Sequence, residues 1–302
     1  MQPPAVQTVD LDPSALAMPI AAEQLPASRP AVVVTGASSG IGLAIARKFL
    51  EKGHNVVLVA RGEALLAAAA ESLRLAAVDN LAVVAIPLDV TRADAYAELA
   101  QRLIAHGLHV DILINSAGMG LGGAFADQAM DELDRLIALN VAAVTRMVHH
   151  AIADMRQRGT GHIINVASLG GYVPGPYQAA YYASKAFVLS LSEALAHELS
   201  GSGIRVSVVA PGPVETGFHA AMGADNALYR LLLPSHSPEQ VAASIYLGYR
   251  LGLRVIVPGV LYRLMGLALR VMPHPIAVPM IGWLLKPREN RATDDRSPVR
   301  RS

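Results

Sequence analysis

The string Thr35-Gly36-Ala37-Ser38-Ser39-Gly40-Ile41-Gly42 follows the apolar run Ala31–Val34 and leads into a stretch of helical periodicity. A strand, a glycine turn and a helix N-terminus in this order make a phosphate site. Glycine lets the backbone approach the anion, and the free N–H groups and the dipole of the helix attract it. The string alone is also compatible with a plain tight turn. Its position at the first strand–helix junction favours a nucleotide site.

Beyond this junction, short β-branched runs alternate with longer helical stretches, which predicts βαβ units and a parallel sheet. The runs contain few polar residues, so helices are expected on both faces. We therefore expect an α/β fold with a doubly wound, Rossmann-type parallel sheet of about seven strands. The expected strands are Ala31–Val34, Asn55–Ala60, Ala82–Leu88, Asp111–Ile114, His162–Val166, Arg205–Val209 and Arg254–Val257. The expected helices are Ile41–Lys52, Glu63–Val78, Ala93–His106, Asp131–Arg158, Ala180–Ser200 and Pro238–Leu251.

The chain has 302 residues and no internal repeat, so we expect one domain with two tails. Residues 31–286 would form this domain, including an apolar C-terminal segment at 251–286. Residues 1–30 hold six prolines and no basic residue before Arg29, so they lack the charged start of a secretory signal and are expected to be flexible. Residues 287–302 are polar and charged without periodicity, which predicts a disordered tail.

The composition excludes several classes of function. Without cysteine there is no disulfide, no thiolate nucleophile and no cysteine-based metal site, which fits the reducing cytoplasm. A formal net charge of +1 gives no reason to expect nucleic acid. His149 and His150 are adjacent and point to different helix directions, so no metal site is expected.

Five further features follow the glycine string in chain order. Asn115-Ser116-Ala117-Gly118 follows the fourth expected strand, and Asn140 lies in the long helix after it. Ser168 lies just after the fifth strand, and Tyr181-Tyr182-Ala183-Ser184-Lys185 opens the next helix. Pro211-Gly212-Pro213-Val214-Glu215-Thr216 follows the sixth strand.

The pair Tyr181 and Lys185 has a chemistry that follows from its spacing. Residues four apart share one face of a helix, so the ammonium group can lie beside the phenol. A neighbouring cation favours the phenolate and would lower the phenol pKa from about 10 towards neutral, which makes a usable general acid/base. Tyr182, three residues from Lys185, and Tyr177, eight residues away, are not excluded by this geometry.

Taken together, these motifs resemble the short-chain dehydrogenase/reductase family over roughly residues 31–260. The glycine string matches the family pattern TGxxxGIG, the tyrosine and lysine match YxxxK, and Pro211–Thr216 matches PGxxxT. Ser116 departs from the family's usual NNAG. The family spacing between its serine and tyrosine selects Tyr181. The resemblance implies that Ser168 bonds the substrate oxygen, Lys185 also holds the nicotinamide ribose, and Asn140 supports a proton relay behind the lysine.

The resemblance also implies a nicotinamide cofactor. An NAD site is expected to carry an acidic residue near position 60, yet Ala60 stands there and Arg61, suited to a 2′-phosphate, follows. We therefore expect NADP(H), with NAD(H) less favoured, although Glu63 is close. The expected cofactor contacts are Gly36, Ser38, Ser39, Gly40, Ile41, Gly42, Arg61, Asp89, Asn115, Ala117, Gly118, Tyr181, Lys185, Pro211, Gly212, Val214 and Thr216.

The function implied by the resemblance is the interconversion of a carbonyl and an alcohol, with Tyr181 as general acid/base. The apolar segment Glu215–Ser237 suggests a hydrophobic small molecule as substrate. One alternative is a non-catalytic NADP-binding regulator or scaffold on the same fold. Another is an epimerase or dehydratase, although those relatives carry larger C-terminal domains. Relatives also pair the helices at Asp131–Arg158 and Ala180–Ser200, which implies a homodimer or homotetramer.

The segment 251–286 poses the only membrane question in the sequence. Its arginines and prolines interrupt every apolar run before the ~20 residues that a spanning helix needs. Residues Val260–Met272 can form a helix that is apolar except for Arg263 and Arg270 on one edge. Such a helix is either a core or oligomer contact, or a peripheral membrane contact through residues 260–285, or a wall for an apolar substrate.

Overall fold

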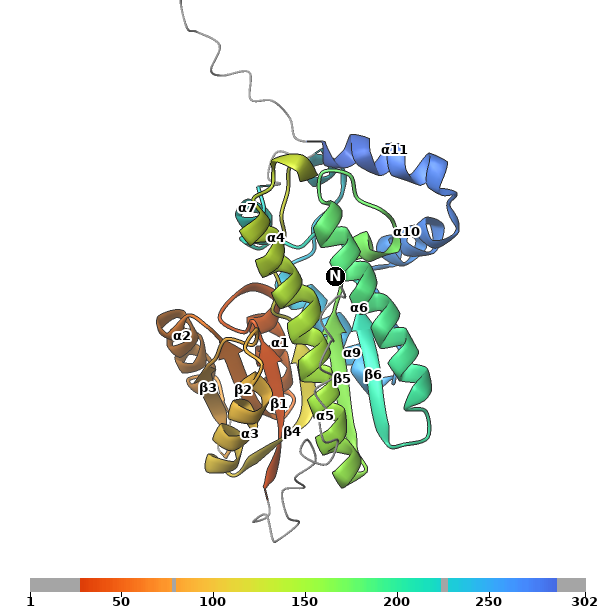
Figure 1. The fold of residues 1–302 in the computed structure, drawn as a ribbon. Coiled ribbons are helices and arrows are strands. Elements are labelled where there is room, and N and C mark those ends of the chain that lie inside the picture. The colour runs from red at the N-terminus through yellow and green to blue at the C-terminus, as the bar shows by residue number, and fades with distance from the viewer. Residues whose placement is uncertain (1–27, 78–79, 224–227, 287–302) are drawn as a thin grey trace, which may run out of the picture.

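In the computed structural model, which describes residues 28–77, 80–223 and 228–286, a parallel sheet lies between two layers of helices (Figure 1). The sheet has seven strands in the order β3-β2-β1-β4-β5-β6-β7. These are β1 (Arg29–Thr35), β2 (Asn55–Ala60), β3 (Val83–Pro87), β4 (Leu108–Asn115), β5 (Gly161–Val166), β6 (Ile204–Val209) and β7 (Val255–Ile256). This order reverses at β1 and β4, and it confirms the expected doubly wound α/β fold.

Two strands begin two or more residues earlier than the sequence predicts. β1 begins at Arg29 and β4 at Leu108, because these two residues pair with each other across the sheet. Arg29 and Pro30 therefore belong to the sheet and not to the expected N-terminal tail. The rest of that tail up to residue 27, and the expected tail at 287–302, lie outside the described residues.

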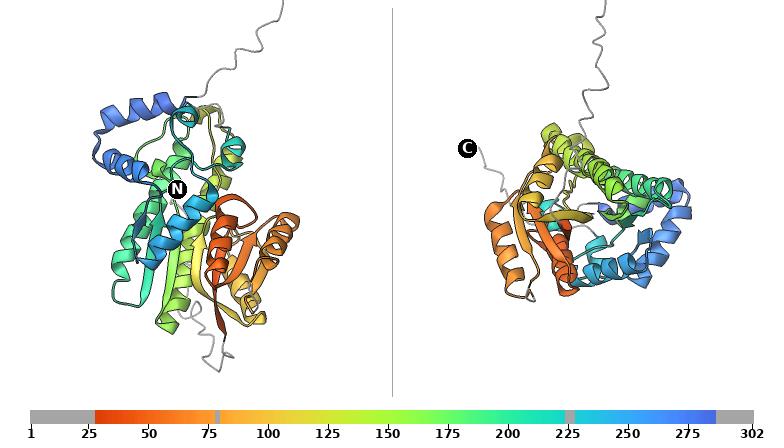
Figure 2. Two further views of the ribbon diagram at one scale, coloured as in Figure 1. Left: turned by 180° about the vertical axis from the view of Figure 1, so that it is seen from behind. Right: turned by 90° about the horizontal axis from the view of Figure 1, so that it is seen from below.

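Each face of the sheet packs against its own set of helices (Figure 2). Alternate strand residues point to opposite faces, so Val33 joins one apolar core and Val34 the other. The first core lies under α3 (Ala95–Ala105), α5 (Val144–Arg158) and α6 (Ala179–Glu198). The second lies under α1 (Gly40–Glu51), α2 (Glu63–Arg74) and α9 (Pro238–Arg250).

The long helix expected at Asp131–Arg158 is not a continuous α-helix. It divides into α4 (Met130–Ile137), a π-helical turn at Ala138–Ala143 (η3) and α5. By length and composition alone the whole stretch Met130–Arg158 could cross a membrane. Its residues Met147, Ala151 and Met155 are nevertheless buried against the sheet, as in a core helix.

The remaining helices lie beyond the carboxyl ends of the strands (Figure 1). The 3₁₀ turns η2 (Phe125–Asp127) and η4 (Leu169–Tyr172) and the short helices α7 (Phe218–Ala221) and α8 (Tyr229–Leu232) belong to the loops there. α10 (Val260–Val271) and α11 (His274–Leu285) close this end of the molecule. The sequence predicted α10 but not α11, because prolines obscure the helical pattern of the latter.

Candidate active site

The glycine turn after β1 has no room for side chains at its glycine positions. Gly36 and Gly40 have φ angles of +68° and +55°, which favour glycine. A Cβ atom on Gly42 would lie 2.3 Å from the carbonyl oxygen of Gly36. A Cβ atom on Gly36 would lie 2.8 Å from the Cα of Ala117. The turn therefore exposes bare backbone at the N-terminus of α1, which fits the phosphates of a dinucleotide.

A chain of buried hydrogen bonds joins this turn to the neighbouring strands. Thr35 Oγ1 accepts bonds of 3.1 Å from the N–H groups of Ser116 and Ala117. Asn115 Nδ2 donates to Asn165 Oδ1 at 2.8 Å, and Asn165 Nδ2 donates to Ser192 Oγ on α6 at 2.9 Å. The chain thus fixes β1, β4, β5 and α6 relative to one another.

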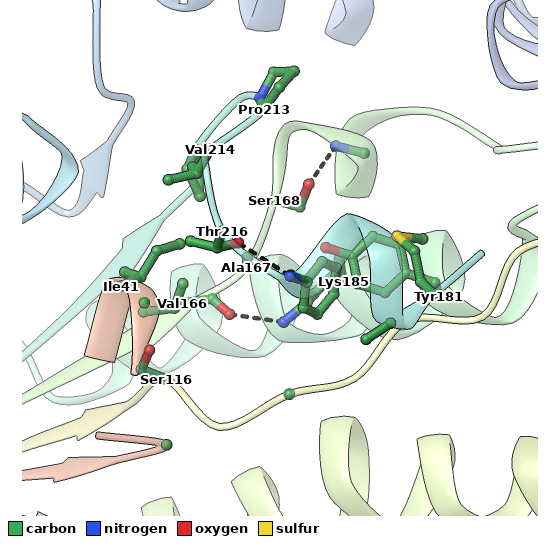
Figure 3. Close-up of a pocket in the computed structure, with 18 of the residues that line it drawn as sticks. Ile41, Ser116, Val166, Ala167, Ser168, Tyr181, Lys185, Pro213, Val214 and Thr216 are labelled. Atoms are coloured by element: carbon green, nitrogen blue, oxygen red, sulfur yellow. Dashed lines mark hydrogen bonds between the residues drawn. The ribbon is translucent and has the colours of Figure 1, made fainter. Parts of the chain in front are cut away.

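Most of the expected site residues line one cavity of about 1430 Å³ (Figure 3). It extends from the glycine turn, along the ends of the strands, to the helices that close that end of the molecule. Asn115 and Asn140 do not line it, because both side chains are buried in hydrogen bonds behind its wall. The side chain of Asn115 bonds to Asn165, and the expected contact of Asn115 with the cofactor stays a prediction. The expected residues that do line it are Gly36, Ser38, Ser39, Gly40, Ile41, Gly42, Arg61, Asp89, Ala117, Gly118, Ser168, Tyr181, Lys185, Pro211, Gly212, Val214 and Thr216.

Ser168, Tyr181 and Lys185 meet at the middle of this cavity (Figure 3). The Ser168 hydroxyl accepts a hydrogen bond of 3.1 Å from the N–H of Gly170 and also bonds the Tyr181 hydroxyl. Tyr181 and Lys185 lie one turn apart on α6, with the Lys185 Nζ 5.8 Å from the centre of the Tyr181 ring. The three polar groups therefore converge from two elements, the loop after β5 and α6.

The electrostatics of this group differ from the sequence expectation. Burial raises the pKa of Tyr181 to about 12, although its hydrogen bond with Ser168 opposes the rise. Burial also lowers the pKa of Lys185 to about 8. The cost of desolvating the phenolate exceeds the attraction of an ammonium this far from the ring. In the protein alone, Tyr181 therefore keeps its proton at neutral pH.

Asn140 lies in the π-helical turn and joins the site from behind. Its Oδ1 accepts from the N–H of Met119 at 3.0 Å, and its Nδ2 donates to the Met119 carbonyl at 2.8 Å and to Ser184 Oγ at 3.0 Å. A Cβ atom on Gly118 would lie 3.3 Å from Asn140 Oδ1 and 3.4 Å from Lys185 Nζ. Asn140 and Lys185 are thus neighbours across Gly118. π-turns recur at functional sites because the extra residue redirects one side chain.

At the other end of the cavity, a cation and a carboxylate follow adjacent strands. Arg61 is exposed just after β2, and Asp89 follows β3. Asp89 Oδ1 accepts from the N–H and the hydroxyl of Thr91 at 2.9 and 2.7 Å. Burial alone would raise the pKa of Asp89, but the Thr91 bonds and the charges of Arg61 and Arg92 outweigh it and lower that pKa. Asp89 therefore presents a fixed carboxylate beside a cation.

The sequence predicted an apolar substrate but not the individual residues that line the apolar end of the cavity. Its only signal was the high apolar content of the segments at 215–237 and 251–286. The lining there, which includes side chains from α10 and α11, is Leu169, Val173, Tyr182, Phe218, Met222, Tyr229, Leu233, Met265, Leu269, Met280, Ile281, Leu284 and Leu285.

The helix spacing alone does not exclude Tyr182 as the general acid. In the structure, its side chain belongs to the apolar lining of the cavity. A Cβ atom on Gly175 would lie 2.3 Å from its ring, and one on Gly170 would lie 2.9 Å from it. The ring therefore fills the space between these two glycines. Burial raises the pKa of its hydroxyl. The Ser168 bond to Tyr181 distinguishes the two tyrosines.

The solved structures that resemble this one include three dehydrogenases. The short-chain dehydrogenase from Sphingobium yanoikuyae in complex with NADPH is 37% identical, with a TM-score of 0.70, and the match covers 79% of this chain and 92% of that one. A short chain dehydrogenase/reductase from Burkholderia phymatum in complex with NAD is 26% identical, with a TM-score of 0.71 and coverage of 80% and 92%. The bulky-bulky ketone specific alcohol dehydrogenase from Comamonas testosteroni is 30% identical, with a TM-score of 0.66 and coverage of 84% and 99%.

The family model described as short chain dehydrogenase matches residues 30–227. This range contains the glycine turn, the Ser168, Tyr181 and Lys185 group, and most of the cavity. Two of the similar structures are in complex with a nicotinamide cofactor, NADPH in one and NAD in the other. Cofactors of this class carry the phosphates that suit the exposed backbone of the glycine turn. The chain belongs to the short chain dehydrogenase family of oxidoreductases.

Proposed function

We propose that this protein is an NADP(H)-dependent oxidoreductase that interconverts a carbonyl and an alcohol on a bulky apolar substrate. The observation that supports this most is the convergence of Ser168, Tyr181 and Lys185 within the cavity that also contains the glycine turn. Tyr181 is the proton donor in this proposal. It lies between the glycine turn, where we propose that the dinucleotide binds, and the apolar end of the cavity, which we call the apolar chamber. When bound, the nicotinamide supplies or accepts the hydride at the reacting carbon.

NADP(H) is the cofactor we propose. Arg61 directly follows β2, where an NAD site would offer a carboxylate. Its charge is close enough to Asp89 to lower the pKa of that carboxyl group. A guanidinium suits a 2′-phosphate because it donates several charge-assisted hydrogen bonds. The bare turn at Gly36–Gly42 would hold the pyrophosphate, and Val214 and Thr216 would lie along the nicotinamide end.

Tyr181 carries the proton in the proposed reaction. In reduction, its hydroxyl donates the proton to the oxygen of the carbonyl as that oxygen gains charge, and Ser168 donates a hydrogen bond to the same oxygen. Lys185 then stabilises the phenolate that remains on Tyr181. A phenol with a pKa of about 12 holds its proton at neutral pH, which suits the reductive direction. Oxidation of an alcohol reverses these steps.

The substrate we propose is a bulky, apolar ketone or secondary alcohol. The chamber beyond Tyr181 is lined by Val173, Met222, Leu269 and Ile281 among other apolar side chains, so desolvation of a polar substrate there would be costly. The similar protein from Comamonas testosteroni is specific for bulky-bulky ketones, which supports this size class.

We further propose a single cytoplasmic catalytic domain that begins at Arg29, where β1 begins, extends to residue 286 and assembles into a homodimer or homotetramer. Exposed apolar side chains on the helical layer of α4 and α6, including Met130, Ile137 and Phe187, support a contact between subunits there. A non-catalytic NADP-binding role would use Lys185 for the ribose but would leave the hydroxyl of Ser168 without a use.

A panel assay tests this proposal. Purified protein is mixed with NADPH or NADH and with ketones of increasing size, and cofactor absorbance is followed. We expect turnover with NADPH that is highest for bulky apolar ketones and is lost in Tyr181→Phe. Cofactor binding without turnover of any carbonyl or alcohol in the panel would instead support the non-catalytic alternative.

A further inference from the structure

The outer faces of α10 and α11 are as apolar as the inner faces. Val260, Leu261, Leu264, Leu267 and Val271 of α10 have exposed fractions between 50% and 75%. They recur at three- and four-residue intervals, so they form one stripe along the helix. Ile276, Met280 and Trp283 form a similar stripe on α11. We call these eight residues the cap face.

The inner faces already have a partner, so burial in the core does not explain the cap face. Tyr262, Gly266 and Leu269 of α10 are buried. Tyr262 donates a hydrogen bond to the carbonyl oxygen of Pro234, and Gly266 lies close to Leu169 and Tyr172 in the loop that follows Ser168. Ala277, Ile281 and Leu285 of α11 are buried in the same cluster. An ordinary surface helix would carry polar residues opposite such a face.

The charged side chains within residues 259–286 have one sign. Residues 259–286 contain Arg263, Arg270 and Lys286 but no aspartate or glutamate, although the chain has 24 acidic residues. Arg270 lies over the ring of Tyr172 and pairs with Glu193 of α6, which anchors α10 to the body of the protein. Arg263 and Lys286 are exposed at the margins of the helices. Cations beside an apolar face complement a surface that is apolar within and anionic at its edge.

Trp283, the only tryptophan in the chain, lies on this face and is 62% exposed. Tryptophan concentrates at membrane–water interfaces, where its ring sits among the headgroups. Met280 is partly exposed and also lines the cavity, so the cap face borders the apolar chamber directly.

We propose that the cap face docks on an anionic lipid bilayer, with α10 and α11 lying in the plane of the interface. The apolar stripes insert below the headgroups, and Arg263 and Lys286 contact lipid phosphates and carboxylates. A second copy of the chain fits this face less well, because a symmetric contact would bring the cations together without a carboxylate from either helix. If the proposed function holds, docking places the chamber beside a phase in which apolar ketones accumulate.

Vesicle binding tests this inference without substrate, cofactor or turnover, so its outcome is independent of the proposed function. The full-length protein is titrated with vesicles of phosphatidylcholine alone or with phosphatidylserine added. Trp283 emission reports contact with the bilayer, and sedimentation measures the bound fraction. We expect a blue shift of the Trp283 emission and co-sedimentation of the protein with the anionic vesicles. At high salt, the binding constant obtained from either readout should fall by roughly tenfold or more.

Two variants make the test specific. Leu264→Glu with Leu267→Glu places charges at the centre of the cap face, outside the cavity lining, and should abolish vesicle binding. Leu75→Glu alters an exposed leucine at the end of α2 and should leave binding unchanged. Absence of binding by the wild type, or equal loss in both variants, would overturn the inference. A blue shift that depends on protein concentration without vesicles would also overturn it and assign the face to a second copy.

Discussion

Lys185 donates a hydrogen bond of 3.0 Å from its Nζ to the carbonyl oxygen of Val166, the last residue of β5. This bond ties α6 to the sheet and holds the ammonium group inside the protein, where only 6% of the residue is exposed. The protein therefore maintains a buried cation at a cost to its stability. Enzymes commonly accept such a cost where a buried charge has a chemical role.

Lys185→Met should remove this cost and the activity together. The pKa of Lys185 falls from 10.5 to about 8 on folding, which corresponds to roughly 3 kcal/mol against the charged form. Part of this gain is lost because the Val166 carbonyl loses its donor, so we expect a net stabilisation on the order of 1–2 kcal/mol at pH 7. Thermal or urea unfolding measures the change, and the same variant should lose most of its turnover.

The pH dependence of the stability difference between Lys185→Met and the wild type identifies the cause of that difference. Below pH 8 the folded protein carries charged Lys185 at full cost, and between about pH 8 and 10.5 the folded state releases the proton while the unfolded state keeps it. The stability advantage of Lys185→Met should therefore shrink as the pH rises through this range. An advantage that stays constant from pH 7 to about 10 would show that the pKa of Lys185 is not lowered.

Tyr181→Phe should reduce kcat by about 10²- to 10⁴-fold, because it removes the proton donor, and it should change NADPH affinity little. The adjacent Tyr182→Phe is the matched control, since its ring fills the space beside Gly170 and Gly175 and phenylalanine keeps that ring. Steady-state kinetics and cofactor titration measure both effects. If Tyr182→Phe were the more damaging change, the assignment of the acid would be wrong.

Arg61→Ala should weaken NADP(H) binding by roughly 10- to 100-fold and leave NAD(H) binding nearly unchanged, because it removes the charge-assisted bonds to the 2′-phosphate. Ala60→Asp combined with Arg61→Ala should invert the preference by adding a carboxylate for the ribose hydroxyls. The readout is the ratio of kcat/KM for NADPH to that for NADH. Arg156→Ala, on an exposed position of α5 outside the cavity, is the control for the loss of one arginine. A ratio insensitive to Arg61 would assign the 2′-phosphate to other residues.

Gly42→Ala should destabilise the protein and weaken the binding of either nicotinamide dinucleotide. Its new methyl group would meet the Gly36 carbonyl oxygen, which is backbone and cannot move aside without opening the turn. Gly62→Ala adds the same methyl group where nothing lies within 4 Å, so its melting temperature should match that of the wild type. Equal melting temperatures for all three proteins would mean that the turn is looser than this structure indicates.

Much of the fold and of the catalytic group could be predicted because their signals are local. Each strand is a short apolar run, the glycine turn is a contiguous string, and Tyr181 and Lys185 are four residues apart on one helix. The start of α9 is local in the same way, because Ser237 and Gln240, three residues apart, bond to each other's backbone N–H groups in a capping box.

The features that the sequence missed depend on contacts between distant segments. The extension of β1 to Arg29 requires its partner Leu108, and the π-turn requires Asn140 to reach both Met119 and Ser184. The pKa of Tyr181 moves opposite to expectation because spacing reveals a neighbouring cation but not the burial of both groups. The sequence did not predict α11 because its apolar residues lie on all sides of the helix and prolines interrupt the helical pattern.

The position of β1 in the sheet also bears on how the chain is made. Val32 pairs with Val56 on one side and with Ile112 on the other, so one edge of β1, an interior strand of the sheet, stays open until β4 has left the ribosome. An open apolar edge of this kind pairs readily with wrong partners. Until β4 is synthesised, the nascent chain is therefore exposed to mispairing at this edge. Because α6 comes later still, a truncated translation product would hold the glycine turn without the tyrosine and would contribute to aggregation, not to turnover.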